Sequence, residues 1–278
     1  MDISKIDWSE IWKEGVIFFG GKADKASSWN RAAVRWNKED ATDYGKKVLK
    51  RIKIKPDWTV LDVGAGPGLL AIPLAKECKH LTALDISGEM LKYLKEKAEK
   101  KKIRNISYVN MPFETVVVDK DLEKHDIVIA SRSMGWEYNL EKFLRNMDEA
   151  AKKRAYVVWG ASDRTFDIGM FKAIGRPYGE TRTYIVIYNL LYQMGIRANI
   201  EIFQTEANSM PYKNIDEAMT ELTNRFARRG TNEEFNQNEK EKLKKYLEEN
   251  FTQSSNGTVS FKNETKFKHA LIWWDKKL

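Results

Sequence analysis

The stretch Val60-Leu61-Asp62-Val63-Gly64-Ala65-Gly66-Pro67-Gly68 decides the fold. A short β-branched run at 59–63 stops at a glycine cluster, and residues 69–76 then have the apolar spacing of a helix. Glycines let the backbone turn tightly after a strand and approach a ligand closely. The helix that follows directs its N-terminal amides at that ligand. The pattern predicts a strand–loop–helix unit with a ligand site at the loop.

Two acidic residues narrow the choice of ligand. The dinucleotide fingerprint G-x-G-x-x-G would need its third glycine where this chain has Leu69. Here Asp62 precedes the glycines, and Asp85 follows the next predicted strand, 80–84. A carboxylate at that second position accepts hydrogen bonds from the hydroxyls of a ribose. The joint pattern of strand, acid, glycine loop, helix, strand and acid therefore predicts a ligand that carries a ribose.

Strands and helices alternate outward from this unit. Further strands are expected at 106–109, 126–130 and 155–159, and helices at 87–101 and 140–151. This alternation is typical of a parallel sheet with right-handed crossovers, so we expect an α/β fold. The C-terminal part is expected to add a helix at 183–194 and strands at 198–205, 258–261 and 268–274. We divide the chain into an N-terminal helical cap, 1–55, and a larger domain, 56–278, with a helical insertion at about 212–252.

At Leu61 to Gly68 and at Leu84-Asp85-Ile86-Ser87 the chain resembles the class I S-adenosylmethionine-dependent methyltransferases. The resemblance covers residues 55–160 well. It implies a Rossmann-like, mostly parallel seven-stranded sheet flanked by helices. It also implies S-adenosyl-L-methionine as the cofactor and S-adenosyl-L-homocysteine as the product.

The resemblance also implies which residues hold the cofactor. In that family Asp62 and the glycine loop face the methionine part, Asp85 takes the ribose, and Ile86 lines the adenine. Pro112 stands where many relatives carry an acid, so contact with the adenine edge is expected from the Phe113 amide or from Glu114. Met90 fits either the cofactor site or the core. The full implied set is Asp62, Gly64, Ala65, Gly66, Gly68, Asp85, Ile86, Met90, Pro112, Phe113, Glu114 and Ser131.

The methyl acceptor is expected beyond the carboxyl ends of the strands, where ligands of open α/β sheets bind. Residues 131–138 and 160–164 lie there, and they supply three candidate bases, Glu137, Tyr138 and Asp163. Arg132 could bind an anionic substrate group or pair with a neighbouring carboxylate. An aromatic N-terminal lid could stack on a flat acceptor. The candidate substrate-binding residues are Trp29, Arg31, Trp36, Arg132 and Trp136.

Three functions remain open, and a small-molecule methyltransferase leads. The formal net charge of +8 and the basic run 46–55 suggest an RNA methyltransferase as an alternative. No Asn/Asp-Pro-Pro-Tyr/Phe tetrad follows the fourth strand, which argues against base N-methylation of that type. Cys78 precedes the second strand and is expected to be a buried small residue rather than a nucleophile. A cofactor-binding protein without catalysis is the second alternative.

Composition excludes several other classes. Nine Trp, eleven Tyr and twelve Phe are not the makeup of a disordered chain. One cysteine and three scattered histidines argue against a disulfide framework and against a metal site, so no metal is expected. The sequence contains no run of about 18 apolar residues, so no membrane span is predicted. The N-terminus lacks the features of a signal peptide, and a cytoplasmic location is therefore expected. The oligomeric state does not follow from the sequence.

Overall fold

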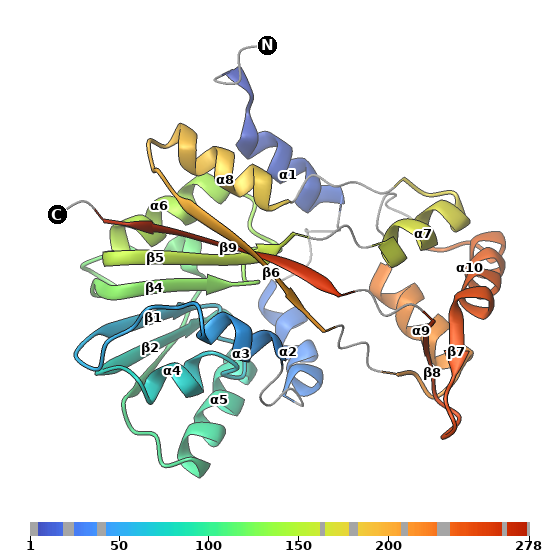
Figure 1. Ribbon diagram of the computed structural model, residues 1–278, viewed down its shortest axis with the longest axis horizontal. Coiled ribbons are helices and arrows are strands. Elements are labelled where there is room, and N and C mark those ends of the chain that lie inside the picture. Colours follow the sequence, from blue (N-terminus) through green and yellow to red (C-terminus); the bar gives the residue numbers. More distant parts are fainter. Residues whose placement is uncertain are drawn as a thin grey trace.

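The computed structural model describes residues 5–18, 25–37, 43–161, 165–177, 183–206, 211–226, 234–262 and 266–276. Its centre is a seven-stranded sheet in the order β3-β2-β1-β4-β5-β9-β6 (Figure 1). The strands are β1 Thr59–Val63, β2 His80–Asp85, β3 Ile106–Asn110, β4 His125–Ser131, β5 Ala151–Gly160, β6 Asn199–Thr205 and β9 Phe267–Asp275. Among the described residues, no helix is long and apolar enough to cross a membrane.

The sheet is mostly parallel, as the sequence predicts. β1 to β5 pair in parallel, whereas β9 runs antiparallel to both β5 and β6. β1 lies between β2 and β4, so the order of the strands reverses at the β1–β4 pair. Open α/β sheets bind ligands beyond the carboxyl ends of the strands at such a reversal. The glycine loop leaves the sheet at this point.

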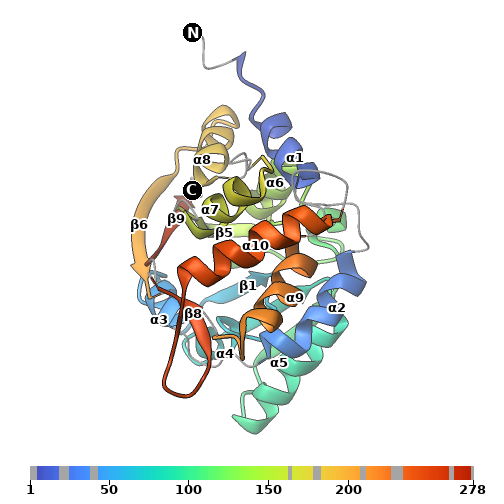
Figure 2. The same cartoon turned by 90° about the vertical axis from the view of Figure 1, so that its right-hand side faces the viewer.

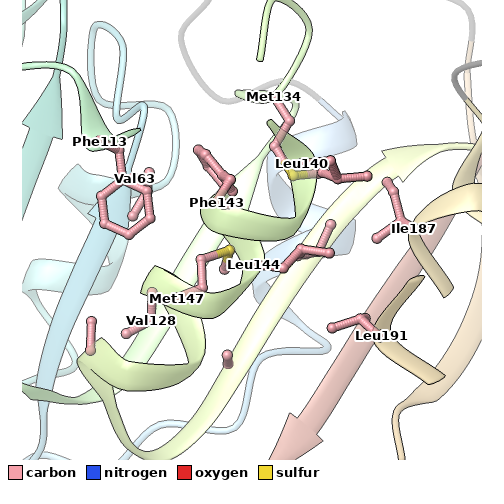
Figure 3. Close-up of a cluster of buried hydrophobic side chains, with 14 of the residues drawn as sticks. Val63, Phe113, Val128, Met134, Leu140, Phe143, Leu144, Met147, Ile187 and Leu191 are labelled. Atoms are coloured by element: carbon pink, nitrogen blue, oxygen red, sulfur yellow. The ribbon is translucent and has the colours of Figure 1, made fainter. Parts of the chain in front are cut away.

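Helices cover both faces of the sheet. The helices of the sheet region are α1 Trp8–Phe18, α2 Lys25–Trp36, α3 Asp43–Leu49, α4 Ala71–Ala75, α5 Gly88–Lys100, the 3₁₀ turn η2 Phe113–Thr115, α6 Leu140–Ala150 and α8 Tyr184–Gln193. Side chains alternate along a strand, so Leu61 and Val63 join one core with α1, α6 and α8, while Val60 joins the other with α3, α4 and α5. Figure 3 shows part of the first core, where Leu144 and other side chains of α6 lie beside Ile187 and Leu191 of α8.

A separate helical lobe lies across the carboxyl ends of the strands. It consists of α7 Thr165–Ile174, α9 Ile215–Phe226, α10 Gln237–Asn250 and the hairpin of β7 Phe251–Gln253 with β8 Val259–Phe261. Viewed from that side, α9 and α10 lie in front of the sheet (Figure 2). The lobe has its own apolar core, which includes Phe171, Leu222 and Leu247.

The lobe joins two segments that are far apart in the sequence. Arg176 lies just after α7, and its Nε is 2.6 Å from Glu239 Oε1 of α10. Its guanidinium carbon lies 4.3 Å from the ring centroid of Phe235. The predicted insertion at 212–252 contains α9 and α10, but no pattern in the sequence indicates that α7 packs with them. The strand predicted at 258–261 lies in the hairpin and not in the main sheet. The division of the chain into a cap and a larger domain stays a prediction.

Candidate functional site

The glycine loop after β1 needs glycine for two different reasons. Gly64 has φ +72°, and a Cβ there would lie 2.3 Å from the Cβ of Ser133. Gly64 therefore permits the close approach of two loops. Gly66 has φ +55° and nothing within 4 Å of its Cβ position, so its side leaves open space. The Gly66 N–H donates to Asp85 Oδ2 at 2.8 Å, which ties the loop to the end of β2.

Two buried carboxylates flank this loop. Asp85 Oδ1 accepts from the Ser87 N–H at 2.8 Å, so backbone donors hold both of its oxygens. Asp62 is 2 % exposed, and its Oδ2 has no hydrogen-bond partner among the residues that the structure describes. Burial raises the pKa of Asp62 to about 7, and the nearby charge of Asp85 adds to the effect. A buried acceptor without a partner is rare in proteins, so Asp62 Oδ2 indicates a donor supplied by a ligand.

One pocket gathers almost all of the residues predicted to bind the cofactor. Asp62, Gly64, Ala65, Gly66, Asp85, Ile86, Met90, Pro112, Phe113, Glu114 and Ser131 line it. Gly68 does not line it. With φ +92°, Gly68 instead lets the chain approach Leu94 of α5, whose Cδ1 lies 2.3 Å from the Cβ position. Ser133, in the predicted acceptor stretch 131–138, also lines the pocket, as do several residues that the sequence did not single out, namely Lys25, Val63, Pro67, Leu69, Leu70, Leu84 and Phe143.

Helix α2 forms one wall of the pocket. Trp29 contacts Trp136 with ring centroids 5.2 Å apart. Lys25 Nζ lies 2.9 Å from Glu114 Oε1 and 3.8 Å from Glu137 Oε2. Lys25 stands one helical turn before Trp29, and this i, i+4 spacing could have pointed to it.

A second contact ties α2 to the cofactor side of the pocket. Asn30 Oδ1 accepts from Ser87 Oγ at 2.6 Å, and Ser87 caps α5 beside Asp85. The predicted lid residue Arg31 is exposed, donates to Ser28 Oγ at 3.1 Å and is not part of the pocket wall. The side chain of Trp36 lies outside the described part of the structure.

The three candidate bases differ in position. Glu137 lines the pocket and is 6 % exposed. Its Oε1 accepts from the Asn139 N–H at 2.9 Å, and its carbonyl oxygen accepts from Trp12 Nε1 at 2.7 Å. Burial raises the pKa of Glu137, whereas the hydrogen bond from the Asn139 N–H and the charge of Lys25 lower it by less. Tyr138 is not among the lining residues, and Asp163 lies outside the described residues.

Acceptor candidates Trp29, Arg132 and Trp136 all line the pocket. Cys78 is buried, as predicted. The basic run 46–55 lies on α3 and the segment after it, and none of its residues lines this pocket. Within that run Lys47 pairs with Asp43 and Arg51 pairs with Glu201. Val48 and Ile52 of the run are buried in the core, and its basic side chains lie outside the pocket.

The residues around the pocket are similar in sequence to known methyltransferases. Residues 60–154 match the family model described as "Methyltransferase domain". An uncharacterized protein of Haemophilus influenzae is 28% identical over 99% of this chain and 98% of its own length. A ubiquinone biosynthesis O-methyltransferase of Coxiella burnetii is 26% identical over 48% of this chain, and the chain spans about half (52%) of that enzyme.

The fold matches solved structures as well. The magnesium protoporphyrin IX methyltransferase of Synechocystis with bound S-adenosylhomocysteine aligns with a TM-score of 0.51 at 14% identity. The alignment covers 96% of this chain and 94% of that one. The family match lies on the strands and loops that form the pocket. The chain therefore carries a methyltransferase domain at residues 60–154, on the fold of the class I S-adenosylmethionine-dependent methyltransferases.

Proposed function

We propose that this methyltransferase acts on a small molecule held between α2 and the loop after β4. The observation that carries the proposal is the enclosure of the pocket by α2, through Trp29 against Trp136 and Lys25 between Glu114 and Glu137. Such a wall suits a compact, partly flat acceptor better than a nucleic-acid backbone. The names of the matched relatives, which refer to ubiquinone biosynthesis and to magnesium protoporphyrin IX, support the same class of acceptor.

The residues present fit S-adenosylmethionine. Asp62 Oδ2 is a buried acceptor that lacks a protein donor, and it would receive the ammonium of the methionine part. Asp85 would receive the ribose hydroxyls, since each carboxylate oxygen can accept more than the one bond it has here. Ile86, Pro112 and Phe113 would line the adenine. When bound, the cofactor supplies an electrophilic methyl group that is open to in-line displacement.

Glu137 is the proposed general base for an acceptor that reacts through O–H or N–H. Its carboxylate lies in the wall of the pocket, and Asn139 and Lys25 hold it in place. Burial raises its pKa, so the ionised group is a stronger base than an exposed glutamate. A nucleophile that carries no proton would need only alignment, and Glu137 would then be dispensable.

Calorimetry with S-adenosylhomocysteine, followed by isotope-labelled S-adenosylmethionine and a metabolite extract, tests the proposal. We expect binding, and transfer of the label to a small molecule identified by mass spectrometry. Glu137→Gln should bind S-adenosylhomocysteine normally but lower turnover about 10²–10⁴-fold. Label on tRNA or rRNA with a steep salt dependence would favour the RNA alternative. Absence of binding by the unmodified protein would contradict the proposal as a whole.

A further inference from the structure

Acidic side chains outnumber basic ones in the wall of the pocket. The charged residues that line it are four acids and two bases, namely Asp62, Asp85, Glu114, Glu137, Lys25 and Arg132. S-adenosylmethionine carries an ammonium, a sulfonium and a carboxylate, so its net positive charge offsets only part of the acidic excess. Charge inside a protein is costly unless it is paired. The remaining excess points to a second positive charge, on the methyl acceptor.

Glu137 has one carboxylate oxygen left for a ligand. The side chain is largely buried and lines the pocket, and its Oε1 accepts from the Asn139 N–H at 2.9 Å. Its Oε2 accepts no hydrogen bond from the residues that the structure describes, since Lys25 Nζ, at 3.8 Å, is beyond hydrogen-bond distance. Largely buried carboxylate oxygens normally have a donor. Oε2 therefore indicates a ligand that brings an N–H or O–H.

Lys25 shows that this wall accommodates an ammonium. Its Nζ lies 2.9 Å from Glu114 Oε1 and 5.9 Å from the ring centroid of Tyr138. The hydrogen bond of Lys25 goes to Glu114, so its pairing with Glu137 is the longer and weaker of the two. Two carboxylates thus share one ammonium. A second ammonium, bound at Glu137 Oε2, would complete the pairing through a charge-assisted hydrogen bond.

An aromatic pair in the same wall distinguishes a cation from a neutral acceptor. The ring centroids of Trp29 and Trp136 lie 5.2 Å apart, and Trp136 directly precedes Glu137 in the chain. The face of an indole attracts cations more strongly than that of any other side-chain ring. A phenol or an alcohol could also donate to Glu137, but it would gain nothing from the acidic excess or from this attraction.

We infer that the methyl acceptor is an amine, protonated in solution, whose nitrogen binds Glu137 Oε2 beside the Trp29–Trp136 pair. The inference rests on the proposed function, since it names the class of its acceptor and the atom that is methylated. Glu137 then has two successive tasks, because it first binds the ammonium and then removes a proton from it.

The chemical step balances with these groups alone. Glu137 Oε2 accepts one proton from the ammonium, which leaves a lone pair on the nitrogen. The nitrogen attacks the methyl carbon, so an N–C bond forms while the C–S bond breaks and its electron pair stays on sulfur. The products are a methylated ammonium and S-adenosylhomocysteine. Glu137 returns its proton to water when the products leave.

Three small probes test the inference on the full chain saturated with S-adenosylhomocysteine. Benzylamine, benzyl alcohol and benzoate share a ring, and at neutral pH they are a cation, a neutral molecule and an anion. Their dissociation constants can be measured by NMR titration. We expect benzylamine to bind about tenfold more tightly than benzyl alcohol. Benzoate should bind more weakly than either, because it adds a negative charge to an acidic wall.

A variant then assigns the preference to Glu137. Glu137→Gln should reduce the preference for benzylamine to about twofold or less, with unchanged affinity for benzyl alcohol and S-adenosylhomocysteine. Glu141→Gln is the matched control, because Glu141 is exposed, pairs with Arg145 on the surface of α6 and does not line the pocket. In the unmodified protein, the labelled product from the metabolite extract should be methylated at nitrogen.

Three results would overturn the inference while leaving the proposed function standing. The first is benzylamine bound no more tightly than benzyl alcohol by a protein that binds S-adenosylhomocysteine normally. The second is a preference for benzylamine that persists in Glu137→Gln. The third is label on an oxygen of the product, as a methyl ether or a methyl ester. A protein that fails to bind S-adenosylhomocysteine would instead contradict the proposed function.

Discussion

The cofactor side of the sheet and the helical lobe are held together in opposite ways. Around β1 and β2 the stabilising hydrogen bonds join residues that are close in the sequence. The backbone N–H groups of Gly66 and Ser87 both donate to the Asp85 carboxylate. In the lobe, α7 meets α10 through Arg176 and Glu239, which are 63 residues apart. Residues close together in the sequence therefore build the candidate cofactor site, whereas the lobe depends on an ion pair between residues far apart in the sequence. The two regions should respond separately to substitution.

Arg176→Ala should have the largest effect and should affect the lobe alone. Arg176 and Glu239 are both largely buried, and removing one partner of a buried pair costs about 3–5 kcal/mol of unfolding free energy. Hydrogen exchange should show lost protection in α7, α9 and α10 while calorimetry shows unchanged binding of S-adenosylhomocysteine. Arg145→Ala is the control, since its pair with Glu141 is exposed. Loss of cofactor binding in Arg176→Ala would mean that the two regions are coupled.

Gly64→Ala should be the most damaging change on the cofactor side. Both it and Gly66→Ala place a Cβ at positive φ, but only Gly64→Ala also forces a Cβ against Ser133. That overpacking should cost about 1–3 kcal/mol beyond the strain the two variants share. Urea unfolding measures the difference. Gly66→Ala should fold better yet bind S-adenosylhomocysteine more weakly, because its methyl group enters the pocket. Equal stabilities would show that the two loops can move apart.

Asp62→Asn should raise the unfolding free energy above pH 7 and should weaken binding of the cofactor. Because the pKa of Asp62 is raised to about 7, the folded state holds this proton more tightly than the unfolded state. The unfolding free energy therefore falls as pH rises from about 4 to 7. After allowance for a buried amide without a partner, the gain above pH 7 should be about 2 kcal/mol. Thermal unfolding against pH checks this, and a gain that persists at pH 4 would contradict it.

Asn30→Ala should have the smallest effect. It removes the acceptor of the Ser87 hydroxyl bond, which joins α2 to the start of α5. A neutral hydrogen bond of this kind contributes about 1 kcal/mol, so binding of S-adenosylhomocysteine should weaken several-fold. Ser28→Ala is the control, because Ser28 lies two residues before Asn30, more than half a helical turn around α2, and its hydroxyl accepts from Arg31 instead. If both variants bind alike, α2 does not contribute to holding the cofactor.

The residues predicted to hold the cofactor could be selected because their signals are local, and their role in binding stays a prediction. Asp62, the glycines and Asp85 are recognisable from their order along one strand–loop–helix–strand unit, and the structure brings them to one pocket. Lys25 could not be found from such a unit, since its partner Glu114 lies 89 residues away, and only its i, i+4 spacing from Trp29 could have pointed to it. No helix was predicted over Thr165–Ile174, so α7 and its place in the lobe were both missed. Periodicity shows which face of a helix is apolar, but not which distant helix covers it.

The position of β9 in the sheet has a consequence for the order of folding. β6 pairs with β9 and with no other strand of the described sheet, and the lobe segment 211–262 lies between the two in the sequence. During synthesis β6 must therefore wait, with one apolar face including Phe203 uncovered, until the whole lobe segment and β9 have left the ribosome. The ring of Phe203 on β6 lies 5.3 Å from the ring of His269 on β9, so this contact can form only when both strands are in place. The β6–β9 edge of the sheet is therefore expected to form last and the glycine loop after β1 to form early.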